Sequence, residues 1–349
     1  MNQKKKWKKK RLFRQVLARI LQKIVKRPLL SEPYTGTLKT IAILTQEKYG
    51  DAILLTPLLK HLKKEFPDTE IHLVTFNKTI TEFFSTDSNV TAIHCAKGNL
   101  ISYFKGVFSQ KFDMLFNTKD HPSTTFLIHS LLIKAHRKAG IDNDFHKGFY
   151  DYLITVDYHS PIPLKNCGLM TILDKPVSAE SCRPYIPPKP VSEKITQFLE
   201  TSGLDGTIGI NISAGWPTRY WTEDKWKTVI DTFTEQKFVV LSSPADLETK
   251  RRLESACPAI LASPPTLNLY ETGMIIDKLR LLVTPDTSLV HVASCQKTPV
   301  VGLYVKALQH QTRFKPFLID HQQVISNTEF VKDITSEAVI SAINELLRR

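Results

Sequence analysis

Residues that could bind phosphate lie where a buried strand is expected to turn sharply into a helix. An apolar stretch at 279–283 leads through Pro285 to Asp286, Thr287 and Ser288, and a helical pattern follows. The first backbone N–H groups of a helix have no partner within it, and the helix dipole adds partial positive charge there. Phosphate is a natural ligand for such an end. A simpler interpretation, in which Asp286 or Thr287 only caps the helix, stays open.

A second turn of this kind lies near the start of the chain. An apolar run at 41–44 is followed by Gly50 and Asp51, and then by a helical pattern over 52–65. We expect Gly50 to supply an unusual backbone angle and Asp51 to be the N-cap of the helix. A carboxylate at a helix N-terminus tends to stay ionised, so it can accept a proton. Asp51 could equally be a cap with no further role.

These two turns, with the segment from Trp216 to Trp221 between them, resemble glycosyltransferase family 9, the ADP-heptose:lipopolysaccharide heptosyltransferases. The resemblance covers roughly residues 39–347, with the three segments in the family's order. It implies an enzyme that transfers heptose from ADP-heptose to the anionic inner core of lipopolysaccharide. The implied reaction inverts the configuration at the anomeric carbon of the sugar and needs neither a metal nor another cofactor.

The resemblance also assigns roles to single residues. Asp51 would be the general base, and Arg219 would bind the donor diphosphate, since a guanidinium can hold two phosphate oxygens. Thr218 beside it could donate another hydrogen bond. The backbone N–H groups of Thr287 and Ser288 would complete the diphosphate site.

Three further features of the donor site have a structural alternative. Asp246 matches an acidic position near the donor ribose, although an exposed helix cap would explain it as well. His291, one turn inside its helix, is either a ligand contact or a buried histidine. The aromatic residues of 216–221 could simply anchor a packed loop.

Strand and helix patterns alternate along the chain in two rounds, which predicts parallel sheets covered by helices. We therefore expect two Rossmann-like α/β domains facing a cleft, the GT-B type, preceded by a basic amphipathic helix. The strands expected first are at 41–44, 71–75, 90–93, 114–116 and near 141. Those expected in the second round are at 208–212, 238–241, 279–283 and 300–304, the last closing the sheet.

The predicted organisation has four parts. A basic segment covers 1–37, and an acceptor domain covers 38–183. A linker follows at 184–206, with four prolines between 184 and 191. A nucleotide-sugar domain covers 207–349, and its C-terminal helix at 335–347 is expected to pack back across the interdomain region.

The net charge of +13 is concentrated at the N-terminus. Residues 1–27 hold 12 Lys and Arg residues and no acidic one, so the remaining 35 basic and 34 acidic residues nearly cancel. A near-neutral body is not expected to bind nucleic acid, which requires a clustered basic face.

Apolar residues recur at helical spacing within this basic segment, with Trp7 just ahead of them. The pattern predicts that residues 4–27 bind an anionic membrane surface. With the resemblance, this places the protein in the cytoplasm, on the inner face of a bacterial inner membrane. A solvated or disordered tail and a targeting peptide are the alternatives.

The five cysteines are scattered without a C-x-x-C motif, which suits a reducing compartment, and the 11 histidines show no metal-ligand spacing. Two other functions stay open. The same fold could use another nucleotide sugar or acceptor, or the chain could be a non-catalytic scaffold at the membrane surface.

Overall fold

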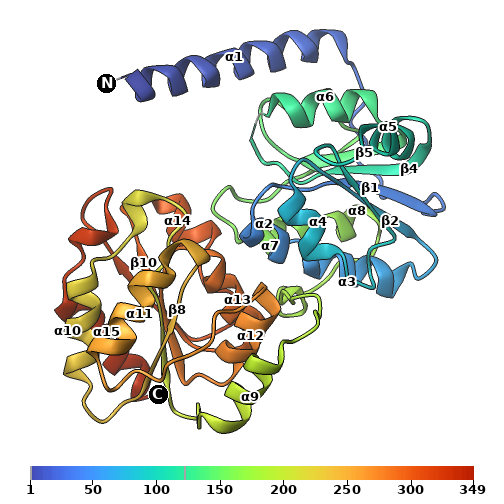
Figure 1. Cartoon of the computed structure of the whole chain (residues 1–349). Helices are drawn as coiled ribbons and strands as arrows, with labels where there is room; N and C mark the ends of the chain where they lie inside the picture. Colours follow the sequence, from blue (N-terminus) through green and yellow to red (C-terminus); the bar gives the residue numbers. More distant parts are fainter. Residues whose placement is uncertain (1, 122) are drawn as a thin grey trace. The chain divides into compact units, whose positions relative to one another are not determined.

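The chain divides into two compact units, Met1–Cys182 and Arg183–Arg349, shown in Figure 1. The structure, a computed structural model, describes residues 2–121 and 123–349. Each unit is built on one parallel sheet with helices, so the predicted pair of Rossmann-like α/β domains is confirmed.

The first unit contains a six-stranded sheet in the order β3-β2-β1-β4-β5-β6, and every neighbouring pair is parallel. Strand β1 lies at its centre and is buried along its length, as parallel strands covered on both faces are. The strands are β1 (Thr40–Leu44), β2 (Glu70–Thr75), β3 (Ala92–Cys95), β4 (Lys111–Asn117), β5 (Lys134–Ile141) and β6 (Tyr152–Ile154).

Helices of the first unit connect these strands, and a long helix precedes them. They are α1 (Asn2–Ile24), α2 (Tyr49–Ile53), α3 (Thr56–Glu65), α4 (Lys78–Phe84), α5 (Leu100–Phe108), α6 (Thr124–Leu132), α7 (Ile162–Cys167) and α8 (Leu169–Ile172), with the short 3-10 helix η1 (Glu180–Cys182). The single helix expected over 52–65 is therefore two helices. Pro57 lies in the first turn of the second, where its missing N–H costs nothing.

The second unit contains a five-stranded parallel sheet in the order β11-β10-β9-β7-β8. Its strands are β7 (Ile208–Asn211), β8 (Phe238–Leu241), β9 (Leu281–Pro285), β10 (Val300–Tyr304) and β11 (His321–Ile325). The expectation that the strand at 300–304 closes the sheet is wrong, because β11 pairs with its outer edge. Strand β11 was not predicted because it begins with the polar residues His321, Gln322 and Gln323 and so contains no run of apolar residues.

The helices of this unit are α9 (Glu193–Thr201), α10 (Glu223–Thr232), α11 (Leu247–Ala256), α12 (Leu269–Asp277), α13 (Ser288–Gln296), α14 (Leu308–Arg313) and α15 (Ser336–Leu347), with the 3-10 helices η2 (Pro217–Arg219), η3 (Pro244–Asp246) and η4 (Val331–Asp333). The segment predicted as a linker, 184–206, thus contains α9. The apolar face of α9 buries Ile195 and Phe198, which explains why this segment belongs to the second unit.

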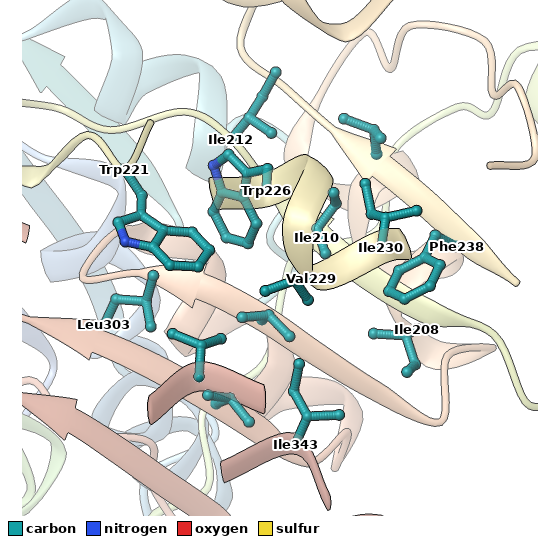
Figure 2. Close-up of a cluster of buried hydrophobic side chains, with 14 of the residues drawn as sticks. Ile208, Ile210, Ile212, Trp221, Trp226, Val229, Ile230, Phe238, Leu303 and Ile343 are labelled. Carbon is teal, nitrogen blue, oxygen red and sulfur yellow. The ribbon is translucent and has the colours of Figure 1, made fainter. Parts of the chain in front are cut away.

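One apolar core fills the space between the second sheet and helices α10 and α15 (Figure 2). Trp221 and Trp226 meet edge to face with their ring centroids 4.7 Å apart. Ile343 of the C-terminal helix α15 is fully buried in the same core. The buried face of this helix belongs to the core of the second unit, and its predicted packing across the interdomain region stays a prediction.

Helix α1 packs against the first unit through part of its apolar surface. Fully buried Ala18 lies in a cluster with Leu127, Phe149 and Tyr150. Beyond the helix, the Arg27 guanidinium pairs with the buried carboxylate of Asp151. None of the described helices is long and apolar enough to cross a membrane.

Candidate functional site

The sheets have the two strand orders that place ligands at a switch point. The first is the 3-2-1-4-5-6 order, with the switch between β1 and β4. The second, read from β8, is the 2-1-3-4-5 order, with the switch between β7 and β9. Ligands of open α/β sheets bind beyond the carboxyl ends of the strands at such points. The loops that follow these four strands are therefore the places to examine.

Asp51 follows β1, but its backbone position differs from the prediction. It lies inside the short helix α2, whose N-cap is Lys48, and Gly50 is not among the residues with positive φ. Both expectations, Asp51 as N-cap and Gly50 as an unusual turn, are wrong because the helix begins three residues earlier than predicted. Asp51 still lies in the first turn, where a helix dipole favours a carboxylate, and its side chain is half-buried.

Lys119, in the loop after β4, is the cation that shares this switch point with Asp51. Its Nζ donates a hydrogen bond of 3.0 Å to Oε1 of Gln46, in the loop after β1. Burial lowers the pKa of Lys119, and the negative charges of Asp51 and Glu47 oppose that shift most strongly. The charge of Asp51 therefore acts on the ammonium group of Lys119 at the switch point of the first sheet.

A buried ion pair supports the loop that carries Lys119. Nζ of Lys165 lies 3.0 Å from Oδ2 of Asp120 and donates a 2.6 Å hydrogen bond to the carbonyl of Tyr158. Asp120 and Lys165 are both almost fully buried. Removing either partner would leave the other as an unpaired buried charge. A buried pair of this kind adds little net stability, so its main effect here is to hold the loop after β4 in one position.

At the switch point of the second sheet, side chains after β7 and β9 form a hydrogen-bonded group. Nδ2 of Asn211 donates to Oγ1 of Thr284 at 2.9 Å and to Oγ1 of Thr287 at 3.2 Å. Thr287 is the N-cap of α13, and its Oγ1 accepts a hydrogen bond from the N–H of Leu289. The predicted cap is therefore Thr287 and not Asp286. Ser288 is the first helical residue, half-buried beside this cap.

Arg219 and Asp286 lie together at this point, joined by His310 from α14. An Arg219 guanidinium nitrogen donates to the carbonyl of Asp286 at 2.8 Å and lies 3.2 Å from its Oδ2. Nδ1 of His310 is 3.3 Å from the same Oδ2 and 3.2 Å from the guanidinium. Oδ2 of Asp286 has no aligned hydrogen bond from any described residue. Asp286 thus contacts both Arg219 and His310.

His291 is buried in α13 without a partner for one ring nitrogen. Its Nδ1 has no hydrogen bond from the residues that the structure describes. Burial lowers the pKa of His291 to about 4, although the nearby Asp286 opposes the shift. The imidazole is therefore neutral near pH 7. An unpaired polar atom at a buried site costs free energy, which a ligand or a water molecule at Nδ1 would recover.

Asp246 occupies the N-cap position of α11 and is partly buried. Its Oδ2 accepts hydrogen bonds from the hydroxyl groups of Tyr220, at 3.1 Å, and Ser243, at 2.9 Å. It makes no side-chain cap bond to α11. Thr218, in contrast, is exposed on η2, and no described contact of its hydroxyl joins it to the other site residues.

The aromatic residues of 216–221 differ in burial. Trp221 is buried in the core and its indole N–H donates to the carbonyl of Ile334 at 3.0 Å, so it anchors the loop as the simpler interpretation expected. Trp216 is 56% exposed. Arg219 is held between them, on a loop that is anchored on its C-terminal side.

Three residues of these sites were not predicted from the sequence: Lys119, Asn211 and His310. Lys119 and Asn211 are polar residues at or just past the end of a buried strand, a signal that the sequence does carry. His310 had no such signal, because it reaches Arg219 from a helix 91 residues away in the chain. Across residues 2–121 and 123–349 no group of three or more His, Cys, Asp or Glu side chains could hold a metal ion.

Two parallel α/β units, each with polar and charged side chains gathered at its switch point, define a Rossmann-like protein of the kind that binds nucleotides. The family model for glycosyltransferase family 9 (heptosyltransferase) matches residues 100–340. The chain belongs to this family and is a glycosyltransferase. A model for a family of unknown function (DUF6913) also matches residues 9–166.

Curated relatives extend the similarity over most of the chain. Lipopolysaccharide heptosyltransferase 3 of Escherichia coli K12 is 25% identical over 288 residues, which cover 73% of this chain and 79% of that protein. The lipopolysaccharide core heptosyltransferase OpsX of Haemophilus influenzae is 24% identical over 300 residues, covering 81% and 83%.

Solved structures agree with the fold. A glycosyltransferase family 9 protein from Veillonella parvula superimposes with a TM-score of 0.69 at 21% identity, covering 92% of this chain and 99% of that one. The E. coli heptosyltransferase WaaC with ADP superimposes with a TM-score of 0.64 at 13% identity, covering 88% and 99%.

Proposed function

We propose that this glycosyltransferase transfers heptose from ADP-heptose to the inner core of lipopolysaccharide, with inversion at the anomeric carbon. The observation that carries the proposal is the group formed by Arg219, Asp286 and His310 beside the N-terminus of α13. The curated relatives are named as lipopolysaccharide heptosyltransferases, and E. coli WaaC has been solved with ADP and with ADP-2-deoxy-2-fluoro heptose. Their names supply the donor and the acceptor of the proposal.

The second unit would hold the donor. A diphosphate placed at the N-terminus of α13 would receive the N–H groups of Thr287 and Ser288 and the guanidinium of Arg219. As the bond between the anomeric carbon and the diphosphate breaks, negative charge grows on the leaving ADP. Arg219 and the helix N-terminus would stabilise that charge where it develops.

The first unit would supply the base. Asp51 would take the proton from the acceptor hydroxyl, whose oxygen then attacks the anomeric carbon from the face opposite the departing diphosphate. One direct displacement inverts the configuration, and no covalent sugar-enzyme intermediate is required. Asp51 lies in the first turn of α2, where the helix dipole favours the ionised carboxylate that this role needs.

We propose that no metal takes part, because Arg219 and α13 together supply positive charge for the leaving group. His291 would present its neutral imidazole to the same site, and Asp246 with Tyr220 would lie near the donor ribose. Asp286 would be a positioning residue for Arg219 and His310, since its carboxylate is almost fully buried.

The basic N-terminal segment, residues 4–27, would hold the enzyme on an anionic membrane surface close to a lipid-linked acceptor. Its 12 cations without a single acidic residue support this part of the proposal. The expected location is the cytoplasmic face of a bacterial inner membrane.

The test is mass-spectrometric detection of sugar transfer to a lipid A acceptor that carries the inner-core sugar Kdo. ADP-heptose is compared with a panel of UDP- and GDP-sugars, with and without EDTA. Transfer from ADP-heptose alone, unchanged by EDTA, is the expected result. Transfer from another donor would replace the substrate, and no transfer combined with no nucleotide binding would favour a non-catalytic scaffold.

A further inference from the structure

Exposed large apolar side chains of the first unit gather on three helices, α1, α5 and α6. Ile101 of α5 is 79% exposed, and its neighbours Leu100 and Phe104 are exposed by more than half. The first turn of α5 therefore presents three large apolar residues to solvent. The others on these helices are Ile128 and Leu132 on α6 and Leu12, Phe13, Val16, Ile20 and Ile24 on α1, while Leu29 and Tyr158 are exposed outside them.

Helix α6 contacts both α1 and α5 in the first unit. Helix α1 packs on α6 through the cluster that contains Ala18 and Leu127. Helix α5 meets α6 through aromatic contacts, because the rings of Tyr103 and Phe108 lie 6.2 and 5.9 Å from the ring of His129. We name the exposed apolar side chains of α1, α6 and α5 the apolar face.

Helix α1 has two apolar stripes, and only one of them is used inside the unit. Ala18 and Leu21 turn toward the unit, and the side-chain amide of Gln22 donates to the carbonyls of Asp144 and Lys147. The stripe that runs through Phe13, Val16, Ile20 and Ile24 stays exposed. A helix fixed by one stripe presents the other in a constant direction, which a flexible tail would not do.

The charge on the apolar face has one sign. Helices α1, α5 and α6 contain no Asp or Glu residue. Exposed cations surround the apolar residues: Arg14, Arg19, Lys23, Lys105 and Lys134. A second copy of the chain on this face would bring two basic surfaces together, and like charges oppose that contact. Anionic lipid headgroups neutralise the cations, while the acyl chains accept the apolar side chains.

We infer that the apolar face lies on an anionic lipid bilayer, with the first turn of α5 inserted as a contact separate from α1. This inference rests on the proposed membrane-bound function and extends it. The exposed stripe of α1 sets how that helix lies on the lipid, and the α5 contact adds a second point of insertion. Insertion of Leu100, Ile101 and Phe104 fixes which side of the first unit meets the lipid.

The experiment measures binding of the full chain to vesicles of phosphatidylglycerol and phosphatidylethanolamine by flotation. Ile101→Glu is expected to weaken binding by at least about tenfold, because a charge replaces an inserted side chain. Leu267→Glu is the matched control, since Leu267 is 75% exposed in the second unit, and it should bind like the native chain. A tryptophan placed by Ile101→Trp should be quenched by brominated acyl chains.

Native binding by Ile101→Glu, with no quenching at position 101, would overturn the inference. A variant that replaces Arg14, Arg19 and Lys23 by Gln separates binding through the cations of α1 from insertion of α5. If only this variant loses binding, α1 acts alone and the proposed function stands without the α5 contact. If neither the native chain nor either variant binds the vesicles, the membrane part of the proposed function fails too. A dimer in solution that Ile101→Glu dissociates would assign the face to a second copy. Melting temperatures identify any variant that fails to fold.

Discussion

Arg219 is the residue on which donor binding depends most in this account. Arg219→Met should weaken ADP binding about 10- to 100-fold, because charge-assisted hydrogen bonds to the diphosphate are lost. The ADP affinity of Arg219→Lys should lie between those of the native enzyme and Arg219→Met, since an ammonium group keeps the charge but lacks the planar geometry of the guanidinium. Isothermal titration calorimetry measures these affinities.

The control for Arg219 must account for its second role. Asp286 would lose a counter-charge in Arg219→Met, so stability also falls. The double variant Arg219→Met, Asp286→Asn should recover stability but not ADP binding. Arg251→Met removes an exposed arginine of the same unit and should leave ADP binding unchanged. Recovery of binding in the double variant would show that Arg219 acts only on the fold.

The buried imidazole of His291 makes a prediction about pH. The unfolded chain protonates this histidine near pH 6.5, whereas the folded chain does so only near 4. Between these values the unfolded state binds more protons, so stability falls as the pH drops from about 6.5 to 4 and is unaffected above that window. The loss amounts to about 3 kcal/mol for one such group. His291→Gln should flatten the slope in denaturant unfolding, and exposed His136→Gln should not.

At the residue scale, Asp51 and Arg219 were singled out through the resemblance to glycosyltransferase family 9, and their roles stay predictions. Their neighbours were not predicted, since Lys119 lies 68 positions from Asp51 and only the sheet order brings them to the same switch point. Asp246 occupies a helix N-cap position, as the simpler interpretation expected, but its side chain accepts a hydrogen bond from Tyr220 of another loop and makes no cap bond.

At the element scale, helix α13 is the part of the donor site that can be tested through its cap. Thr287→Ala removes the cap bond to Leu289 and should cost about 1 kcal/mol of stability. It should also weaken ADP binding, because the cap orients the helix end that would hold the diphosphate. Thermal unfolding and calorimetry give the two quantities.

A second helix of the same unit provides a matched control for this cap. Thr335 caps α15 in the same manner, by accepting from the N–H of Ala338. Thr335→Ala should cost a similar stability without changing ADP affinity. Equal loss of affinity in both variants would mean that the effect passes through general destabilisation and not through the site.

Elements with strong apolar patterns were predicted from the sequence, and weak ones were missed. The central strands β1 and β9 are buried throughout, so their runs are unmistakable. Strand β6 is three residues long and β11 is largely polar, and neither produces a run of apolar residues. Helix starts were the least accurate, as the position of Asp51 inside α2 shows.

At the scale of the whole molecule, membrane binding should have two contributions, electrostatic attraction of the basic segment and insertion of apolar side chains, which respond differently to salt. The basic segment should respond to salt, because its cations act on lipid headgroups through a screened field. Raising the salt from 0.1 to 0.5 M should weaken binding of the full chain to anionic vesicles substantially but not completely. The remainder should come from apolar insertion, which salt does not screen. Complete release in a sedimentation assay would contradict a contribution from the apolar face.

The position of α1 also changes how the basic segment should be removed. A deletion of residues 1–30 would uncover the cluster around Tyr150 and break the pair between Arg27 and Asp151. Loss of activity in that variant would then report on folding. Charge substitutions on the exposed side of α1 leave these contacts intact and therefore test the membrane directly.

The central claim is that Asp51 is the base of a sugar transfer whose donor is held by the other unit. The measurement is the single-turnover rate of transfer by Asp51→Asn, with ADP affinity determined on the same sample and exposed Asp68→Asn as control. We predict a rate lower by about two to four orders of magnitude with ADP affinity unchanged, and no effect of the control. A rate within about threefold of the native enzyme, or a loss that follows ADP affinity, would contradict the account.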